Sequence, residues 1–170
     1  MYDYAEPRVG LLSIGAEASK GSSLIVEAHG LLQANSQINF IGNVEGGDIV
    51  RGQCQIVVTD GFTGNVALKL IEGTVQMMFE VMQLEARSSM RGRLGGVLLR
   101  SSLHKVRDRL DYRRYGAAPL LGVNGKVFIG HGRSDAQAIT SAISTANEAH
   151  NFGVLDQLKA SITDGQGSVY

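Results

Sequence analysis

The chain has 170 residues, of which 44% are hydrophobic, and its formal net charge is zero. Its 22 glycines and only two prolines suit a globular chain with many tight turns and exclude collagen-like and low-complexity chains. The single cysteine, Cys54, excludes an internal disulfide. No uncharged apolar run reaches membrane-spanning length, and the N-terminus lacks a signal-peptide pattern, so we expect one cytoplasmic domain over residues 1–170.

The charge is distributed unevenly. The segment Arg87–Arg114 holds nine of the sixteen basic residues and only two acidic ones, Asp108 and Asp111, so it carries +7. A segment of this sign favours an anionic partner. Nucleic acid is not the partner we expect, because no aromatic residues alternate with the basic ones and no recognition motif accompanies them.

The near-continuous apolar run in Arg8–Gly15 predicts a strand with both faces covered. A loop follows, and it leads into a helix that Ser22 or Ser23 caps and that Asn35 ends. Lys20 lies in the loop. It is either a solvated turn residue or a positive charge on an anionic substrate.

A second strand is predicted over Ile38–Val44, and Glu45 and Asp48 follow it. Two carboxylates three residues apart could share acid–base work, or they could cap a short helix, and both readings stay open. The third strand is predicted over Gln55–Thr59. Cys54, just before it, is expected to be a small buried apolar residue and not a nucleophile.

A polar segment separates the third strand from a long helix that runs to about Arg87. Glycine-rich turns between a strand and a helix leave backbone N–H groups available to an anion. The helix has one narrow polar stripe, so most of its circumference needs covering, in part by a second subunit. The expected donors of the turn are Asp60, Gly61, Thr63, Gly64 and Asn65.

The next segment predicts a second amphipathic helix, over Leu99–Leu110, after three glycines, Gly92, Gly95 and Gly96, that break the helical pattern. With the long helix it would form a protruding hairpin over about residues 66–111. The leucine-rich, basic tip suits an anionic membrane or an acidic protein, unless its leucines lie in a dimer. Its contact residues would be Arg91, Arg93, Val97, Leu98, Leu99 and Arg100.

After a connection over Ala117–Gly125, a fourth strand is predicted over Lys126–His131, and a helix follows from Ala136. Ser134 or Asp135 would cap this helix. His131, at the strand end, is placed either as a proton donor and anion ligand or as a structural residue. A last helix is expected over Leu155–Ile162, with a frayed end, and three other histidines are expected to face solvent without partners: His29, His104 and His150.

Strands that alternate with helices predict an α/β fold with a mainly parallel sheet and a ligand site at the carboxyl ends of its strands. The sequence contains no metal-binding cluster and no nucleophile with an attendant base. It therefore favours direct group transfer over a covalent enzyme intermediate.

Several of these turns resemble motifs of one family. The segments are R-V-G-L-L-S-I-G at 8–15, K-G at 20–21, N-V-E-G-G-D-I at 43–49, D-G-F-T-G-N at 60–65, A-P-L-L-G-V-N-G at 118–125 and H-G-R-S at 131–134. Together they are similar to the C-terminal half of the phosphate acyltransferase family, PlsX. The D-G-F-T-G-N segment before a long helix is the most specific.

The resemblance implies transfer of a fatty acyl group from acyl-acyl carrier protein to inorganic phosphate, giving acyl phosphate for phospholipid synthesis. It also implies a three-layer α/β/α fold like that of isopropylmalate dehydrogenase and phosphotransacetylase, a homodimer and peripheral association with the membrane. No cofactor or metal is expected.

Within that resemblance, phosphate would be held at helix N-termini and would attack the thioester directly. Asn65 and His131 are the expected catalytic residues, and the other substrate-binding residues would be Lys20, Asp60, Gly61, Thr63, Gly64, Gly132 and Ser134. Two alternatives remain: a non-catalytic module for dimerisation and membrane binding, because only half of the family's length is present, and phosphotransacetylase-like transfer to coenzyme A.

Overall fold

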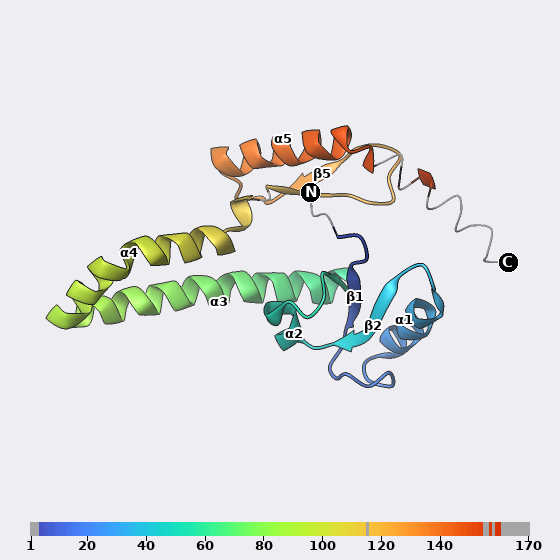
Figure 1. The fold of residues 1–170 in the computed structure, drawn as a ribbon, viewed down its shortest axis with the longest axis horizontal. Helices are drawn as coiled ribbons and strands as arrows, with labels where there is room; N and C mark the ends of the chain where they lie inside the picture. Colours follow the sequence, from blue (N-terminus) through green and yellow to red (C-terminus); the bar gives the residue numbers. More distant parts are fainter. Residues whose placement is uncertain (1–3, 115, 155–156, 158, 161–170) are drawn as a thin grey trace. The chain divides into compact units, whose positions relative to one another are not determined.

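The computed structural model describes residues 4–114, 116–154, 157 and 159–160 (Figure 1). They fall into two compact units, the N-terminal unit within Tyr2–Arg93 and the C-terminal unit within Leu94–Tyr170. That both belong to one domain stays a prediction. Most of the expected last helix, 155–162, and all of the expected frayed end lie outside the described residues.

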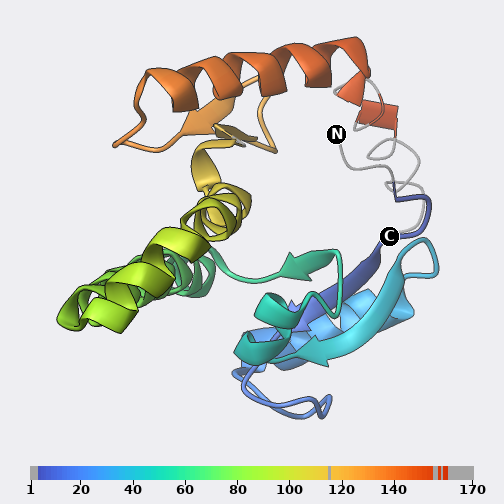
Figure 2. The same cartoon turned by 60° about the vertical axis from the view of Figure 1, so that its left-hand side comes forward.

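The N-terminal unit is built on a three-stranded parallel sheet. Its strands are β1 (Arg8–Leu12), β2 (Asn39–Val44) and β3 (Ile56–Val58), in the order β2-β1-β3 (Figure 2). Both pairings are parallel, with Leu12 opposite Val44 and Leu11 opposite Val58. The three predicted strands of this region and the mainly parallel α/β sheet are therefore confirmed.

The core of this unit lies at β1. Val9, Leu11 and Leu12 are buried there, with Val44 beside them on β2. The strand ends at Leu12, three residues earlier than expected, and Ile14 is 82% exposed although we expected it in the buried run. The Ser13 N–H still donates to the carbonyl of Val44, 2.9 Å away, after which the chain leaves the sheet for the loop.

Two short helices connect these strands. Helix α1 (Ser23–Ala34) begins after Ser22 and ends at Asn35 as predicted, and it packs beside β2. Helix α2 (Gly46–Arg51) begins after Glu45. The Glu45 N–H donates to the Asp48 carboxylate at 2.9 Å, and the Glu45 side chain accepts in return, so the two carboxylates form a capping box. The capping interpretation of this pair is thus confirmed.

The two long helices are α3 (Gly61–Ser88) and α4 (Met90–Leu110), and one residue, Ser89, separates them. The glycines we expected to break the helix lie inside α4 instead. Gly92 is needed there for space, since a Cβ would lie 2.8 Å from the carbonyl oxygen of Ala86. The Ser89 hydroxyl accepts from the Gly92 N–H at 3.0 Å, as a helix cap does. That α3 and α4 pack as a hairpin stays a prediction.

No residue of α3 or α4 is buried within this chain, although α3 is apolar around most of its circumference. Within the part of the chain that the structure describes, no helix is long and apolar enough to cross a membrane.

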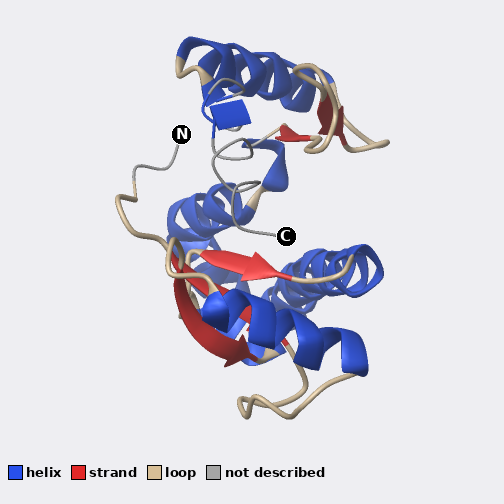
Figure 3. Ribbon diagram, turned by 90° about the vertical axis from the view of Figure 1, so that its right-hand side faces the viewer, coloured by secondary structure: helices blue, strands red, loops and turns tan. Residues whose placement is uncertain are grey.

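In the C-terminal unit, a 3-10 turn η1 (Tyr112–Arg114) precedes β4 (Ala117–Pro119), β5 (Phe128–Gly130) and α5 (Ala136–Asn151). The expected connection therefore contains a strand, and the expected fourth strand pairs with it antiparallel in a separate two-stranded sheet. The sequence did not predict this short strand, because its proline and the flanking glycines are typical of a turn. Helix α5 packs on β4, β5 and η1, and buries Ala138 and Ala149 (Figure 3).

Candidate functional site

The predicted site residues of the N-terminal unit lie at one edge of its sheet. Because β1, β2 and β3 are parallel, the turns that follow them leave the sheet at the same edge. These turns carry Lys20, the Glu45–Asp48 capping box and the D-G-F-T-G-N segment, respectively. The edge offers one lysine among several carboxylates.

Asp60 caps α3, and it accepts hydrogen bonds from backbone amides that we expected to bind an anion. The helix begins at Gly61, so Asn65 lies within the helix and not in the preceding turn. One Asp60 carboxylate oxygen accepts from the N–H groups of Phe62 and Thr63, at 3.0 and 2.9 Å. The Gly64 N–H donates to the Asp60 carbonyl at 2.9 Å. The expectation that these amides are available to a ligand is therefore wrong for this part of the turn.

The electrostatics of the turn follow from this cap. Hydrogen bonds from the side chain and then the backbone N–H of Thr63 hold the pKa of Asp60 below its ordinary value, so the carboxylate is ionised at neutral pH. An incoming anion meets a negative charge here. Of the donors that we expected here, the side chains of Lys20 and Asn65 are exposed, and the Gly61 N–H belongs to the first residue of the helix.

Gly64 serves packing at the start of α3. A Cβ at this position would lie 2.7 Å from the Thr59 methyl carbon, so glycine allows the helix to begin close to the end of β3.

The Lys20 loop is held by a buried amide that the sequence did not single out. Asn43 is 8% exposed, and its Nδ2 donates to the Glu17 carbonyl at 2.8 Å. Its Oδ1 is therefore the acceptor for the His29 Nδ1–H, at 2.9 Å. The Ser13 hydroxyl adds a bond to the carbonyl of Lys20 at 3.0 Å. The strand carries a second amide, Asn39, so the sequence alone gave no signal that singled out Asn43.

His29 is consequently not the solvent-facing histidine that we expected. It is half-buried, bonded to Asn43 and packed edge-on against Phe40, with ring centroids 5.2 Å apart. His150 and His104 are exposed as expected, but His150 does have a partner, since its Nδ1 contacts the Lys126 ammonium. Cys54 is half-buried beside Gly10, where a Cβ would lie 3.0 Å from its sulfur.

We expect Asn43→Ala to destabilise the N-terminal unit by about 1–3 kcal/mol, because it leaves the Glu17 carbonyl and His29 without their partner. Urea unfolding followed by circular dichroism measures this loss. Asn39→Ala, an exposed amide on the same strand, is the matched control and should change the free energy of unfolding little. Equal effects of the two substitutions would contradict the role of Asn43.

The predicted residues of the C-terminal unit lie together in the turn from β5 to α5. The Ser134 N–H donates to the His131 carbonyl at 2.9 Å, and the Arg133 N–H donates to the His131 Nδ1 at 3.1 Å. The neutral imidazole therefore carries its proton on Nε2. Gly132 lies between them in the turn and is exposed.

The Ser134 hydroxyl is the notable group of this turn. Its oxygen is buried, and among the described residues it has no hydrogen-bond partner. A buried hydroxyl normally has a partner, and leaving it unpaired costs free energy. A ligand oxygen in this turn could satisfy it.

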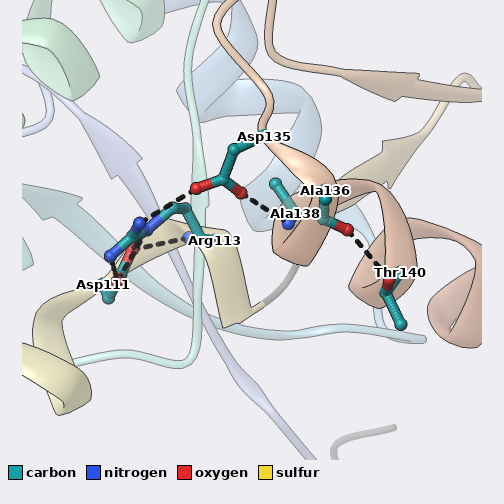
Figure 4. Close-up of polar contacts among 6 residues, drawn as sticks. All are labelled: Asp111, Arg113, Asp135, Ala136, Ala138 and Thr140. Atoms are coloured by element: carbon teal, nitrogen blue, oxygen red, sulfur yellow. Dashed lines mark hydrogen bonds and ion pairs between the residues drawn. The ribbon is translucent and has the colours of Figure 1, made fainter.

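Asp135, not Ser134, caps α5. Its Oδ1 accepts from the Ala138 N–H at 2.9 Å, and its Oδ2 lies 3.0 Å from the Arg113 guanidinium (Figure 4). The Ala138 N–H and then Arg113 hold the pKa of Asp135 below its ordinary value, so this helix N-terminus also carries its own carboxylate.

The structure thus brings the expected residues together in two sets, one in each unit. That the Lys20 and Asp60–Asn65 set and the His131–Ser134 set form one site stays a prediction. Within the described ranges, no three His, Cys, Asp or Glu side chains are grouped to hold a metal ion.

The residues expected at the tip lie on α4. Arg91, Arg93 and Arg100 are exposed, and so are the apolar side chains between the last two. Val97 is 71%, Leu98 76% and Leu99 56% exposed, which leaves an uncovered apolar surface next to basic residues.

Parallel strands with polar turns at their carboxyl ends, followed by helices, define a mixed α/β protein, a class in which ligands bind beyond the carboxyl ends of the strands. Over residues 1–157 the chain matches the family model described as "Fatty acid synthesis protein", and it belongs to that family. This is the phosphate acyltransferase family that the sequence motifs resemble.

Proteins named phosphate acyltransferase match most of the chain. The one from Thermus thermophilus is 50% identical over 153 residues, covering 90% of this chain and 47% of that protein. The Nostoc punctiforme protein is 45% identical, covering 91% and 46%, and the Halothermothrix orenii protein is 46% identical, covering 94% and 48%. The chain therefore spans about half the length of the curated relatives that it matches, and corresponds to their C-terminal half.

Proposed function

We propose that this chain is the C-terminal half of an enzyme that transfers a fatty acyl group from acyl-acyl carrier protein to inorganic phosphate, giving acyl phosphate for phospholipid synthesis. The observation that carries the proposal is identity of 45 to 50% to proteins named phosphate acyltransferase over nearly the whole chain. The two polar turns, with Lys20, the Ser134 hydroxyl and the His131 ring, supply the chemistry that a phosphate and a carbonyl need.

In this mechanism a phosphate oxygen forms a bond to the thioester carbonyl carbon, and the carbonyl oxygen takes up negative charge. The carbon–sulfur bond then breaks, and the carrier protein leaves as a thiolate that takes a proton from solvent. Lys20, Gly61 and Ser134 would bind phosphate, while Asn65 and the Nε2–H of His131 would donate to the developing oxyanion. No residue is assigned as general base, because phosphate is already an anion.

Asp60 and Asp135 have a second part in this proposal. Asp60 accepts from the N–H groups of Phe62 and Thr63, and Asp135 accepts from that of Ala138, so phosphate is directed to side-chain donors and to the N–H groups of Gly61 and Gly132. Thr63 and Gly64 shape the turn around it: Thr63 through its bonds to Asp60, and Gly64 through its close approach to Thr59.

The assay that tests the function uses this chain together with the N-terminal half of a family member. Long-chain acyl-acyl carrier protein and phosphate are added, and acyl phosphate is measured. Formation of acyl phosphate supports the proposal. If the chain is inactive even with the other half present, it is a non-catalytic module, and a preference for a short acyl donor with coenzyme A would identify phosphotransacetylase-like transfer.

The finer architecture belongs to the same proposal. A three-layer α/β/α fold and a homodimer would cover the apolar circumference of α3, of which no residue is buried within this chain. Packed as a hairpin, α3 and α4 would present the tip residues to an anionic membrane or to the acidic carrier protein, in a cytoplasmic enzyme that associates peripherally with the membrane. The exposed Val97, Leu98 and Leu99 among arginines support this surface.

Vesicle flotation separates the possible partners of the tip. The chain should float with vesicles of anionic phospholipid and not with neutral ones, and Leu98→Glu should abolish flotation. Flotation that Leu98→Glu leaves intact would contradict the membrane surface. Retention of the chain by immobilised acyl carrier protein in the absence of lipid would assign the surface to that partner instead.

A further inference from the structure

Arg113 joins two carboxylates at the point where the chain enters the C-terminal sheet. Its Nε lies 2.9 and 2.8 Å from the two Asp111 carboxylate oxygens, and one of its terminal nitrogens lies 3.0 Å from the Asp135 Oδ2 (Figure 4). A planar guanidinium can serve two carboxylates in this fixed arrangement, whereas a lysine ammonium is a single point charge.

Asp135 connects this ion pair to the His131–Ser134 turn. It directly follows Ser134, and its other oxygen caps α5 through the Ala138 N–H. The position of the Asp135 carboxylate therefore sets where the turn meets the helix. A shift of the Asp135 backbone would move Ser134 with it, because the two residues share a peptide bond.

We propose that Arg113 is a positioning residue for the His131–Ser134 turn, and that it acts through Asp135 and touches no substrate. The inference rests on the proposed function of that turn in phosphate binding. It adds to that function a residue from η1, nearly twenty residues before the turn, that fixes where the Ser134 hydroxyl and the His131 ring lie.

The charge of the cluster explains why the arginine matters. Two carboxylates share one guanidinium, and the side chain of Asp111 is only 12% exposed, against 48% for Asp135. Without Arg113, the poorly solvated Asp111 carboxylate loses its counterion, and the more exposed Asp135 is free to swing toward solvent. The turn then loses the ion pair that holds Asp135. The C-terminal unit still keeps the close packing of Gly116 on α5.

The variants separate position from stability. Asp135→Asn keeps an acceptor for the Ala138 N–H, since asparagine caps helices as well as aspartate does, but it removes the ion pair. Arg113→Met removes the same pair from the other side. Arg113→Lys keeps the positive charge but lacks the planar guanidinium group. Arg114→Met changes an exposed neighbouring arginine and is the matched control.

In the enzyme assembled with the N-terminal half, we expect Arg113→Met and Asp135→Asn each to raise the KM for phosphate about tenfold or to lower kcat by a similar factor. The double variant should be no worse than either single variant, since both remove one interaction. Arg113→Lys should recover part of the loss, and Arg114→Met should match the parent.

A magnetic resonance measurement on the 170-residue chain makes the test independent of activity. In Arg113→Met and Asp135→Asn, but not Arg114→Met, the amide resonances of Gly132 and Ser134 and the ring resonances of His131 should shift. Shifts without any acyl phosphate from the parent enzyme would leave the positioning role standing and remove the proposed function. Unchanged resonances and kinetics in folded Arg113→Met, or additive effects in the double variant, would overturn the inference.

Discussion

We expect His131→Ala to lower turnover about 100-fold in an enzyme assembled from this chain and an N-terminal half of the family, which is the usual effect of removing one oxyanion donor. The His131 Nδ1 is held by the Arg133 N–H at 3.1 Å, so the neutral ring donates from Nε2. The KM for phosphate should change less than turnover, because this bond strengthens as negative charge develops on the carbonyl oxygen.

Two further substitutions test which ring nitrogen is used. His131→Gln places an amide N–H near the position of Nε2 and should keep part of the turnover, whereas His131→Asn imitates Nδ1 and should not. Acyl phosphate formation under saturating phosphate measures all three variants. Asn65→Ala should lower turnover as well. Full turnover in both His131→Ala and Asn65→Ala would remove the site assignment.

Gly116→Val is expected to destabilise the C-terminal unit by more than about 3 kcal/mol, the largest stability effect that we predict. The φ of Gly116 is +68°, a region that side-chain-bearing residues rarely adopt. A Cβ there would also lie 2.6 Å from the carbonyl oxygen of Ala138 and would collide with the backbone of Ser141 and Ala142. Backbone atoms of a helix cannot move aside as the end of a flexible side chain can.

Two glycines of the same unit serve as graded controls. Gly125 has open space around it and no positive φ, so Gly125→Ala should have little effect. Gly122 has open space but a φ of +81°, so Gly122→Ala measures the conformational cost without a collision. Thermal unfolding followed by circular dichroism should give Gly116→Val a much lower melting temperature than Gly122→Ala. A Gly116→Val chain as stable as the Gly125→Ala chain would show that the C-terminal unit does not depend on close packing of Gly116 against α5.

The ends of the helices are the features that local sequence patterns predict best. The end of α1 at Asn35, the Glu45–Asp48 capping box and the aspartate cap of α5 each depend on residues a few positions apart. The sequence predicted the first, and it gave each of the other two as one of two alternatives. The start of α3 was placed too late because glycine and threonine suggested a turn, although Asp60 is itself a good cap and the helix begins one residue after it.

The strand pairing and the buried polar contacts were less accessible. Ala117–Pro119 reads as a loop until β5 pairs with it, and Asn43 reads as an ordinary strand residue until His29 and the Glu17 carbonyl are placed beside it. These partners are between 9 and 26 positions away in the sequence. No local rule selects one such partner among many.

By itself, the sequence determined the family, the three parallel strands of the N-terminal unit and the chemical character of the polar turns, because spacing and residue type carry that information locally. Only the tertiary structure decided which donors those turns keep for a ligand. Asp60 and Asp135 occupy the helix N-termini that we expected to bind an anion, while the Ser134 hydroxyl is buried without a partner among the described residues. The reason is that a hydrogen bond depends on where two groups lie in space, and the fold alone sets that.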